Sequence, residues 1–210
     1  MKINNLPIAN DQRLTVFGGV NVIESDDLLF HVAEEFKSVA EKYKFNYVFK
    51  ASFDKANRSS ADSFRGPGLE EGLESLRKIK EKFEVPLVTD IHEPNQAEAV
   101  AEVCDVIQIP AFLCRQTDLI IAAAKTKKII NIKKPQFSSA KEMFHAVSKC
   151  EKAGNSDVIL CERGNIFGYN NLVVDTLNFQ ILKDSGKPIF FDVTHSLQQP
   201  GMLEKSTGGR

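Results

Sequence analysis

Seven short runs of apolar residues punctuate the chain, and polar residues or Gly and Pro bound each run. They lie at residues 15–23, 47–53, 86–92, 106–112, 129–134, 157–163 and 188–195. Short apolar runs bounded in this way are typical of buried β-strands. The sequence therefore predicts seven strands in regular succession.

The stretches between these runs have the spacing of amphipathic helices. Segment 25–44 begins with Ser25, a favourable N-cap, followed by Asp26 and Asp27 in the first turn. Its apolar residues mark one face: Leu29, Val32, Ala33, Phe36, Val39 and Ala40. The other predicted helices lie at 68–83, 95–103, 116–126, 139–154 and 171–186.

Strands that alternate with helices indicate a parallel sheet covered by helices, here as one domain over residues 1–210. We expect a (β/α)₈ TIM barrel with seven strands visible, because a full barrel typically needs about 250 residues. The last run leads into the Gly/Ser-rich end EKSTGGR, so the eighth β/α unit is expected to be missing. Residues 1–14 are expected to form a small β-hairpin at the barrel bottom. A doubly wound open sheet is the alternative, although no GxGxxG motif opens the first helix.

Charge and cysteine content exclude several classes of function. The chain has 27 Lys and Arg against 28 Asp and Glu, a formal net charge of −1, so nothing favours nucleic acid or a membrane surface. No apolar run approaches the roughly 20 residues of a membrane span. The four cysteines lack CxxC spacing, which is typical of reduced thiols in a cytoplasmic protein.

Cations recur where the predicted strands end, and chemistry in barrels gathers at these ends. The six are Lys50, Lys55, Arg58, Arg115, Lys133 and Arg163. They follow four different strands, and a barrel mouth would bring them together. Arg can bind two phosphate oxygens at once. The pattern predicts a substrate with several negative charges, such as a phosphorylated carboxylate.

Each of these signals also has a plain structural explanation. The run IINIKK is equally compatible with a strand that simply extends into solvent. His31 and His145 lie on helical patterns and are expected to be structural or exposed. Asp90, His92 and Glu93 have the composition of a metal site, but neighbouring residues of a strand alternate between faces, which disfavours one. The prediction therefore depends on the repetition across strands.

Several longer motifs strengthen this interpretation. They are FKASFDKANRSS, SFRGPGLEEGL, TDIHEP, IQIPAFLCRQTDL, NIKKPQF, CERGNIFGYNNLVVD and FDVTHSLQQPG. In this order, from about residue 15 to the last residue, they closely resemble the 3-deoxy-D-manno-octulosonate 8-phosphate (KDO-8-phosphate) synthases. A related synthase of the aromatic pathway shares fold and chemistry, but KANRSS is similar to the octulosonate enzymes.

The resemblance implies a transferase that condenses phosphoenolpyruvate with D-arabinose 5-phosphate and water. The products are KDO 8-phosphate and inorganic phosphate. It also implies a homotetramer in the cytoplasm that serves lipopolysaccharide biosynthesis.

The resemblance also implies roles for individual residues. The phosphate of phosphoenolpyruvate would bind Lys133 and Arg163, and its carboxylate would bind Lys50, Ser52, Lys55 and Gln108. The pentose phosphate would bind Asn57, Arg58 and Ser59, and Arg115 would reach a neighbouring subunit's pentose phosphate. The implied catalytic residues are Asn21, Lys55 and His195.

Asn21 also bears on the cofactor that the resemblance implies. Metal-dependent members resemble GPC at the end of the first strand, with Cys as a ligand, whereas this chain has Asn21 there. A neutral amide is a poor substitute for a thiolate at a transition metal. The resemblance is thus to the metal-independent class, with no cofactor and with His195 hydrogen bonding.

Two other functions stay open from the sequence. One is an aldolase of the same fold that uses Lys50 or Lys133 to form a Schiff base, which requires a lysine of lowered pKa. The other is a truncated, catalytically inactive module that binds a sugar phosphate.

Overall fold

A computed structural model of the chain describes residues 1–58, 60–169, 171–200, 202 and 208–209. Its centre is a parallel sheet in which every strand neighbours the next along the chain. The seven strands are β3 Thr15–Gly19, β4 Asn46–Lys50, β5 Leu87–Asp90, β6 Val106–Ile109, β7 Ile129–Lys133, β8 Val158–Glu162 and β9 Ile189–Phe191. The sheet curls into part of a barrel, so the predicted seven-stranded α/β barrel-like fold is confirmed.

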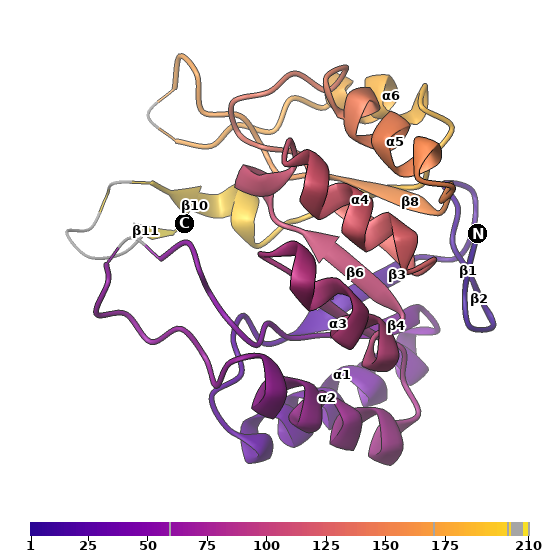
Figure 1. Ribbon diagram of the computed structural model, residues 1–210, viewed down its shortest axis with the longest axis vertical. Coiled ribbons are helices and arrows are strands. Elements are labelled where there is room, and N and C mark those ends of the chain that lie inside the picture. The colour runs from indigo at the N-terminus through magenta and orange to yellow at the C-terminus, as the bar shows by residue number, and fades with distance from the viewer. Residues whose placement is uncertain (59, 170, 201, 203–207, 210) are drawn as a thin grey trace.

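Helices follow the strands and cover the outer face of the curled sheet (Figure 1). The α-helices are α1 Asp26–Tyr43, α2 Leu69–Phe83, α3 Ala97–Val103, α4 Thr117–Lys125, α5 Met143–Lys152 and α6 Leu177–Lys183. Short 3₁₀ turns lie at η1 Pro94–Gln96, η2 Ala111–Leu113 and η3 His195–Leu197. The main hydrophobic cluster fills the space between this helical layer and the sheet.

Helix α1 shows why the sequence pattern was informative. Ser25 is extended and its side chain accepts a hydrogen bond from the backbone N of Leu28, as an N-cap should. Leu29, Ala33 and Ala40 of the predicted apolar face are buried, whereas Val39 is exposed. The face is therefore narrower than the spacing suggested.

The helix predicted at 171–186 is wrong in its first part. Asn165 and Val173 form an antiparallel bridge with two backbone hydrogen bonds of 2.9 Å, which holds this segment extended. Helix α6 begins only at Leu177. This bridge overrides the helical spacing of the residues that follow it.

A small antiparallel hairpin closes the end at which the strands begin. Strands β1 Lys2–Ile3 and β2 Leu6–Pro7 pair as predicted for residues 1–14. Ile3 and Ile8 pack into a second apolar cluster with the first inward-facing residues of the sheet, which are Val48, Val88, Val106, Ile129 and Ile159. Figure 1 shows this hairpin opposite β10 Gln198–Gln199 and β11 Gly208–Gly209, which form a second hairpin.

Side chains alternate between the two faces of each strand, and this alternation determines where polar and charged residues lie on the inner face of the sheet. Two residues after the apolar inner positions Val48, Val88 and Val106 lie Lys50, Asp90 and Gln108 on the same face. The inner face is thus apolar at its base and polar at the carboxyl ends. This change positions the candidate site.

The two outer strands of the sheet, β3 and β9, approach each other at the base. The rings of Phe17 and Phe190 lie 4.5 Å apart between centroids. The Asn10 side chain accepts a hydrogen bond of 2.8 Å from Ile189 N and donates one of 3.0 Å to Lys187 O. Within the described residues β3 and β9 do not pair with each other, and the expectation that an eighth β/α unit is missing stays a prediction.

The cysteines and helices bear on two further predictions. All four cysteines are free and buried, as expected for packing residues with reduced thiols. Burial raises the pKa of Cys104 to about 12. Across the described residues, none of the helices combines the length and apolar character needed to cross a membrane.

Candidate active site

A cavity of about 520 Å³ opens at the carboxyl ends of the strands. Most of the predicted site residues line it: Asn21, Lys50, Lys55, Asn57, Arg58, Gln108, Lys133, Arg163 and His195. Segments far apart in the sequence thus meet in one space large enough for small ligands. Five of the six predicted cations converge here.

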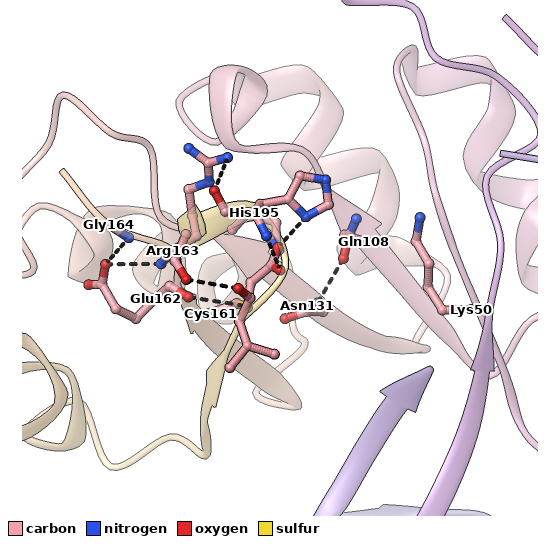
Figure 2. Close-up of polar contacts among 12 residues, drawn as sticks. Lys50, Gln108, Asn131, Cys161, Glu162, Arg163, Gly164 and His195 are labelled. Carbon is pink, nitrogen blue, oxygen red and sulfur yellow. Dashed lines mark hydrogen bonds and ion pairs between the residues drawn. The ribbon is translucent and has the colours of Figure 1, made fainter. Parts of the chain in front are cut away.

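Two buried cations stand side by side at the ends of β7 and β8. Lys133 pairs with Cys161 in the sheet register, and Arg163 comes two residues later on the same face. Their residue exposures are only 9% and 4%. Arg163 Nη2 donates to Gln198 Oε1 at 2.8 Å. It also donates to His195 O at 3.3 Å (Figure 2). Arg163 Nη1 is buried without a hydrogen-bond partner among the described residues, so it is available to an acceptor.

Asp192 organises the same corner of the cavity. Its carboxylate contacts Lys133 Nζ and lies 2.7 Å from His195 Nδ1. The other carboxylate oxygen accepts a 2.9 Å hydrogen bond from His195 N. Burial lowers the pKa of Lys133, and burial followed by the charge of Lys133 lowers the pKa of His195 to about 3.

A second group of charges surrounds a buried hydroxyl at the ends of β4 and β5. Ser52 Oγ accepts from Lys50 Nζ at 2.7 Å and from Lys55 Nζ at 2.8 Å, and it donates to Asp90. Asp90 also lies 4.0 Å and 3.9 Å from the two ammonium groups. Ser52 lies below the lysines and does not line the cavity itself.

Burial and like charges set the protonation of this group. Burial lowers the pKa of Lys50 to about 7, which Asp90 opposes and Lys55 and Lys133 reinforce. Burial disfavours the charged form of Asp90, but Lys55 and Lys50 outweigh burial and hold the pKa of that carboxyl well below its usual range. Asp90 therefore stays ionised, whereas Lys50 titrates near neutral pH.

The backbone of β3 approaches β4 closely beside this group. A Cβ on Gly19, whose φ is +156°, would lie 2.1 Å from the carbonyl oxygen of Lys50. Only glycine fits there. Two residues on, Asn21 lines the cavity, and its carbonyl oxygen accepts a hydrogen bond of 3.5 Å from Lys50 Nζ.

The loop of residues 54–67 forms one wall of the mouth. Asn57 and Arg58 line the cavity but are exposed. Arg65 Nε donates to Asp54 Oδ1 at 2.8 Å, and Lys55 N donates to Arg65 O at 2.7 Å, so the two ends of the loop are joined. Ser59, predicted to bind the pentose phosphate, lies outside the described residues.

Arg115 is the exception among the six cations. Its side chain is 74% exposed, and it lines a different cavity of about 390 Å³ with Glu142, 3.7 Å away, and Lys149. The expectation that all six cations meet is therefore wrong for Arg115. It follows η2, which carries the chain past the cavity mouth.

Several residues that line the cavity were not predicted to bind substrate or to act in catalysis, and Asp90 among them was weighed only as part of a disfavoured metal site. They are Ser63, Asp90, Phe112, Gln136 and Gln198. Asp90 ends a strand on the inner face and could have been found by its spacing from Val88. The contact of Gln198 with Arg163 depends on how β10 folds back, for which the sequence has no signal.

The structure also shows what Asp90, His92 and Glu93, which have the composition of a metal site, contact. His92 Nε2 lies 3.4 Å from Asp90 Oδ2, and Glu93 caps η1. In the portion of the chain that is described, no three His, Cys, Asp or Glu side chains gather in a way that could hold a metal ion. His31 and His145 are exposed on their helices, as predicted.

Comparison with known proteins adds a family and relatives. Residues 2–207 match the DAHP synthetase I family. The whole chain is 60% identical to a 2-dehydro-3-deoxyphosphooctonate aldolase of Ectopseudomonas mendocina (strain ymp) and to one of Pseudomonas putida (strain GB-1). It is 59% identical to an enzyme of the same name from Marinobacter nauticus (strain ATCC 700491 / DSM 11845 / VT8). The chain covers 75% of each of these relatives.

Proposed function

The chain belongs to the DAHP synthetase I family, and we propose that it catalyses the reaction named for its relatives: the condensation that yields 3-deoxy-D-manno-octulosonate 8-phosphate. The substrates are phosphoenolpyruvate, D-arabinose 5-phosphate and water, and the second product is inorganic phosphate. The family motifs, the 60% identity and the cationic cavity support the same assignment.

The observation that carries the proposal is the buried pair Lys133 and Arg163. Lys133 supplies a compact ammonium charge, and Arg163 supplies a planar guanidinium whose Nη1 has no hydrogen-bond partner among the described residues. Both groups suit the phosphate of phosphoenolpyruvate. Little water competes at these positions, so each charge-assisted hydrogen bond is stronger than at a surface. This corner is the proposed phosphate site.

The cluster around Ser52 is the proposed carboxylate site. Lys50 and Lys55 present ammonium groups to the cavity, and Gln108 adds an amide whose oxygen already accepts from Asn131 Nδ2 at 3.1 Å. Ser52 and Asp90 fix the positions of the two lysines. A planar carboxylate placed here would put the enol carbons between the two sites.

The 54–67 loop is the proposed site of the pentose phosphate, through Asn57, Arg58 and Ser59. Arg58 is the cation of this wall, and the loop lies beside the carboxylate site. Arg115, which is exposed, is proposed to reach the corresponding site of a neighbouring subunit in a homotetramer. The proposed location of the enzyme is the cytoplasm, and its product is proposed to serve lipopolysaccharide biosynthesis.

The proposed chemistry needs orientation and charge stabilisation rather than a covalent enzyme intermediate. C3 of the enol attacks the aldehyde carbon of the pentose while water adds to C2. The resulting hemiketal phosphate then loses inorganic phosphate by cleavage of its C–O bond. Lys133 and Arg163 are proposed to stabilise the charge on the leaving phosphate, and His195, which lines the same cavity, is proposed to lie near the reacting carbons.

We propose that the reaction needs no metal ion. The support is Asn21, whose amide stands where metal-dependent members carry a cysteine ligand. The backbone N of His195 donates a hydrogen bond to Asp192, and the imidazole Nδ1 lies 2.7 Å from the same carboxylate. Insensitivity of the turnover rate to EDTA is the expected result, and a loss that added Mn²⁺ or Zn²⁺ restores would contradict it.

One observation favours a second candidate, a Schiff-base aldolase. Lys50 has the lowered pKa that an amine nucleophile requires. Borohydride treatment in the presence of phosphoenolpyruvate and pentose phosphate distinguishes the two. A covalent adduct on Lys50 supports the aldolase, whereas unmodified protein with continuing turnover supports the synthase.

The direct test is release of inorganic phosphate from phosphoenolpyruvate, with and without D-arabinose 5-phosphate and with and without EDTA. The synthase predicts release that requires the pentose phosphate and ignores EDTA. Binding of phosphoenolpyruvate without any release would instead indicate an inactive sugar-phosphate-binding module.

A further inference from the structure

Each of the two strand ends that carry the phosphate site bears a second charged residue facing the opposite way. Lys134 follows Lys133 at the end of β7, and Glu162 precedes Arg163 at the end of β8. Because side chains alternate along a strand, the second pair points into the helical layer. Figure 2 shows the Glu162 side chain turned away from Lys50, Gln108 and His195.

Lys134 is fully buried in this layer, at 0% exposure. Its ammonium group donates to Asn165 Oδ1 at 3.0 Å and to Pro135 O at 3.1 Å. Longer contacts reach Gly164 O at 3.4 Å and Ser138 O at 3.5 Å. One lysine thus binds the loop that follows β7 and the loop that follows β8.

Glu162 is also 0% exposed and completes the pair, with Oε1 lying 3.5 Å from Lys134 Nζ. The same oxygen accepts hydrogen bonds from the backbone of Arg163 at 2.9 Å and of Gly164 at 2.6 Å (Figure 2). The carboxylate therefore holds the backbone on which the phosphate-binding guanidinium is mounted. Gly164 has a φ of +93°, a conformation that favours glycine.

Asn165 extends the connection between the loops. Its amide nitrogen donates to Ser138 O at 3.1 Å and to Gln136 O at 3.3 Å, while its oxygen accepts from Asn178 Nδ2 at 3.2 Å. Gln136 itself lines the cavity. A polar network therefore runs directly behind the phosphate site, from one strand end to the other.

Such a network is costly to build. A fully buried ion pair is often no more stabilising than well-packed apolar residues of the same volume, so stability alone does not explain it. We propose that Lys134 and Glu162 are positioning residues, which act through the backbones of Lys133 and Arg163 to fix the separation and direction of the two phosphate-binding cations. The inference rests on the proposed function, because the two residues are inferred to position the cations of the proposed phosphate site.

The test compares the wild-type chain with three variants of the pair: Glu162→Gln, Lys134→Met and the double variant. Glu162→Gln keeps an acceptor for the two backbone N–H groups and removes only the charge. The double variant removes both charges, so it restores much of the stability lost in either single variant. Lys80→Met is the control, since Lys80 forms a 3.0 Å ion pair with Asp105 near the opposite ends of the strands.

The first readout is the dissociation constant of inorganic phosphate, measured by calorimetry. By analogy with residues that orient metal ligands, we expect it to rise about 10- to 100-fold in the pair variants and to be unchanged in Lys80→Met. The double variant is decisive. If it regains thermal stability but still binds phosphate weakly, the pair positions the phosphate site and does not act only on stability.

The second readout is kinetic. The KM for phosphoenolpyruvate rises in the pair variants while the KM for D-arabinose 5-phosphate stays near its wild-type value. A folded double variant with wild-type phosphate affinity overturns the inference and leaves the proposed function intact. A wild-type chain that binds neither phosphate nor phosphoenolpyruvate overturns the proposed function first, and the inference with it.

Discussion

The two proposed anion-binding regions of the cavity are built in different ways. Lys133 and Arg163 stand on strand ends, are 9% and 4% exposed, and are backed by a buried polar network. Arg58 is exposed on the 54–67 loop, and its Nε donates to the nearby carbonyl oxygen of Phe64 at 3.2 Å. One region is fixed before a ligand arrives, whereas the other takes its shape from a loop held at its two ends.

The comparison has a direct electrostatic consequence. A charge in a protected strand-end position interacts strongly with a ligand and weakly with salt, while an exposed charge is screened within about 8 to 10 Å at physiological ionic strength. The proposed reaction breaks the C–O bond to the phosphate held at the strand ends. The rigid region should therefore control kcat, and the loop should control affinity for the second substrate.

The largest effect is expected from Arg163→Ala. Loss of the guanidinium removes stabilisation of the leaving phosphate, and kcat/KM for phosphoenolpyruvate should fall by about 10³-fold, as for the loss of an oxyanion donor. Steady-state phosphate release measures it. Arg77→Ala, on the exposed face of α2, is the matched control. Near-normal kinetics in Arg163→Ala would contradict the proposal that the strand-end region controls kcat.

The next effect is the pH dependence carried by Lys50. Its pKa is lowered to about 7, so the ammonium group that is proposed to bind the carboxylate loses its charge as the pH rises above that value. We expect kcat/KM for phosphoenolpyruvate to fall by up to about tenfold per pH unit there. The profile of kcat/KM from pH 6 to 9 measures it.

Lys50→Arg is the control for this profile. Arginine stays charged throughout the range, so the decline near pH 7 should disappear even if the variant is slower overall. A decline that persists unchanged in Lys50→Arg would assign the titration to another group.

The sequence predicted the strand-end region better than the loop region. Lys133 and Arg163 could be placed because each follows an apolar run, and the period of two along a strand fixes the face on which they lie. The same rule would have found Asp90. Residues that depend on chain reversals, such as Gln198 beside Arg163, gave no local signal.

The errors have the same physical origin. Arg115 follows a strand end, yet a 3₁₀ turn carries it past the cavity mouth to Glu142. The early part of the helix predicted at 171–186 yields to the bridge between Asn165 and Val173. Local spacing determines which face of a regular element a residue occupies, but long-range contacts determine the course of the loops between elements.

A smaller effect is expected from Arg58→Ala. Because the side chain is exposed, its loss should raise the KM for D-arabinose 5-phosphate about tenfold, at the lower end for hydrogen bonds to charged groups. The KM for phosphoenolpyruvate should stay nearly constant. Added KCl should weaken pentose phosphate binding in the wild type more than in the variant, and equal salt dependence would argue against a phosphate contact.

The smallest effect tests how much the loop depends on its joined ends. Asp54→Ala removes the carboxylate that Arg65 Nε contacts at 2.8 Å, and leaves the Lys55 N to Arg65 O hydrogen bond in place. Exposed ion pairs contribute little, so the KM for D-arabinose 5-phosphate should rise only about two- to fivefold. Glu74→Ala, which removes an exposed ion pair on α2, should leave both KM values unchanged. If Asp54→Ala instead lowers kcat as strongly as Arg163→Ala, the loop helps to hold the reacting groups, and the division between a rigid catalytic region and an adaptable binding region is wrong.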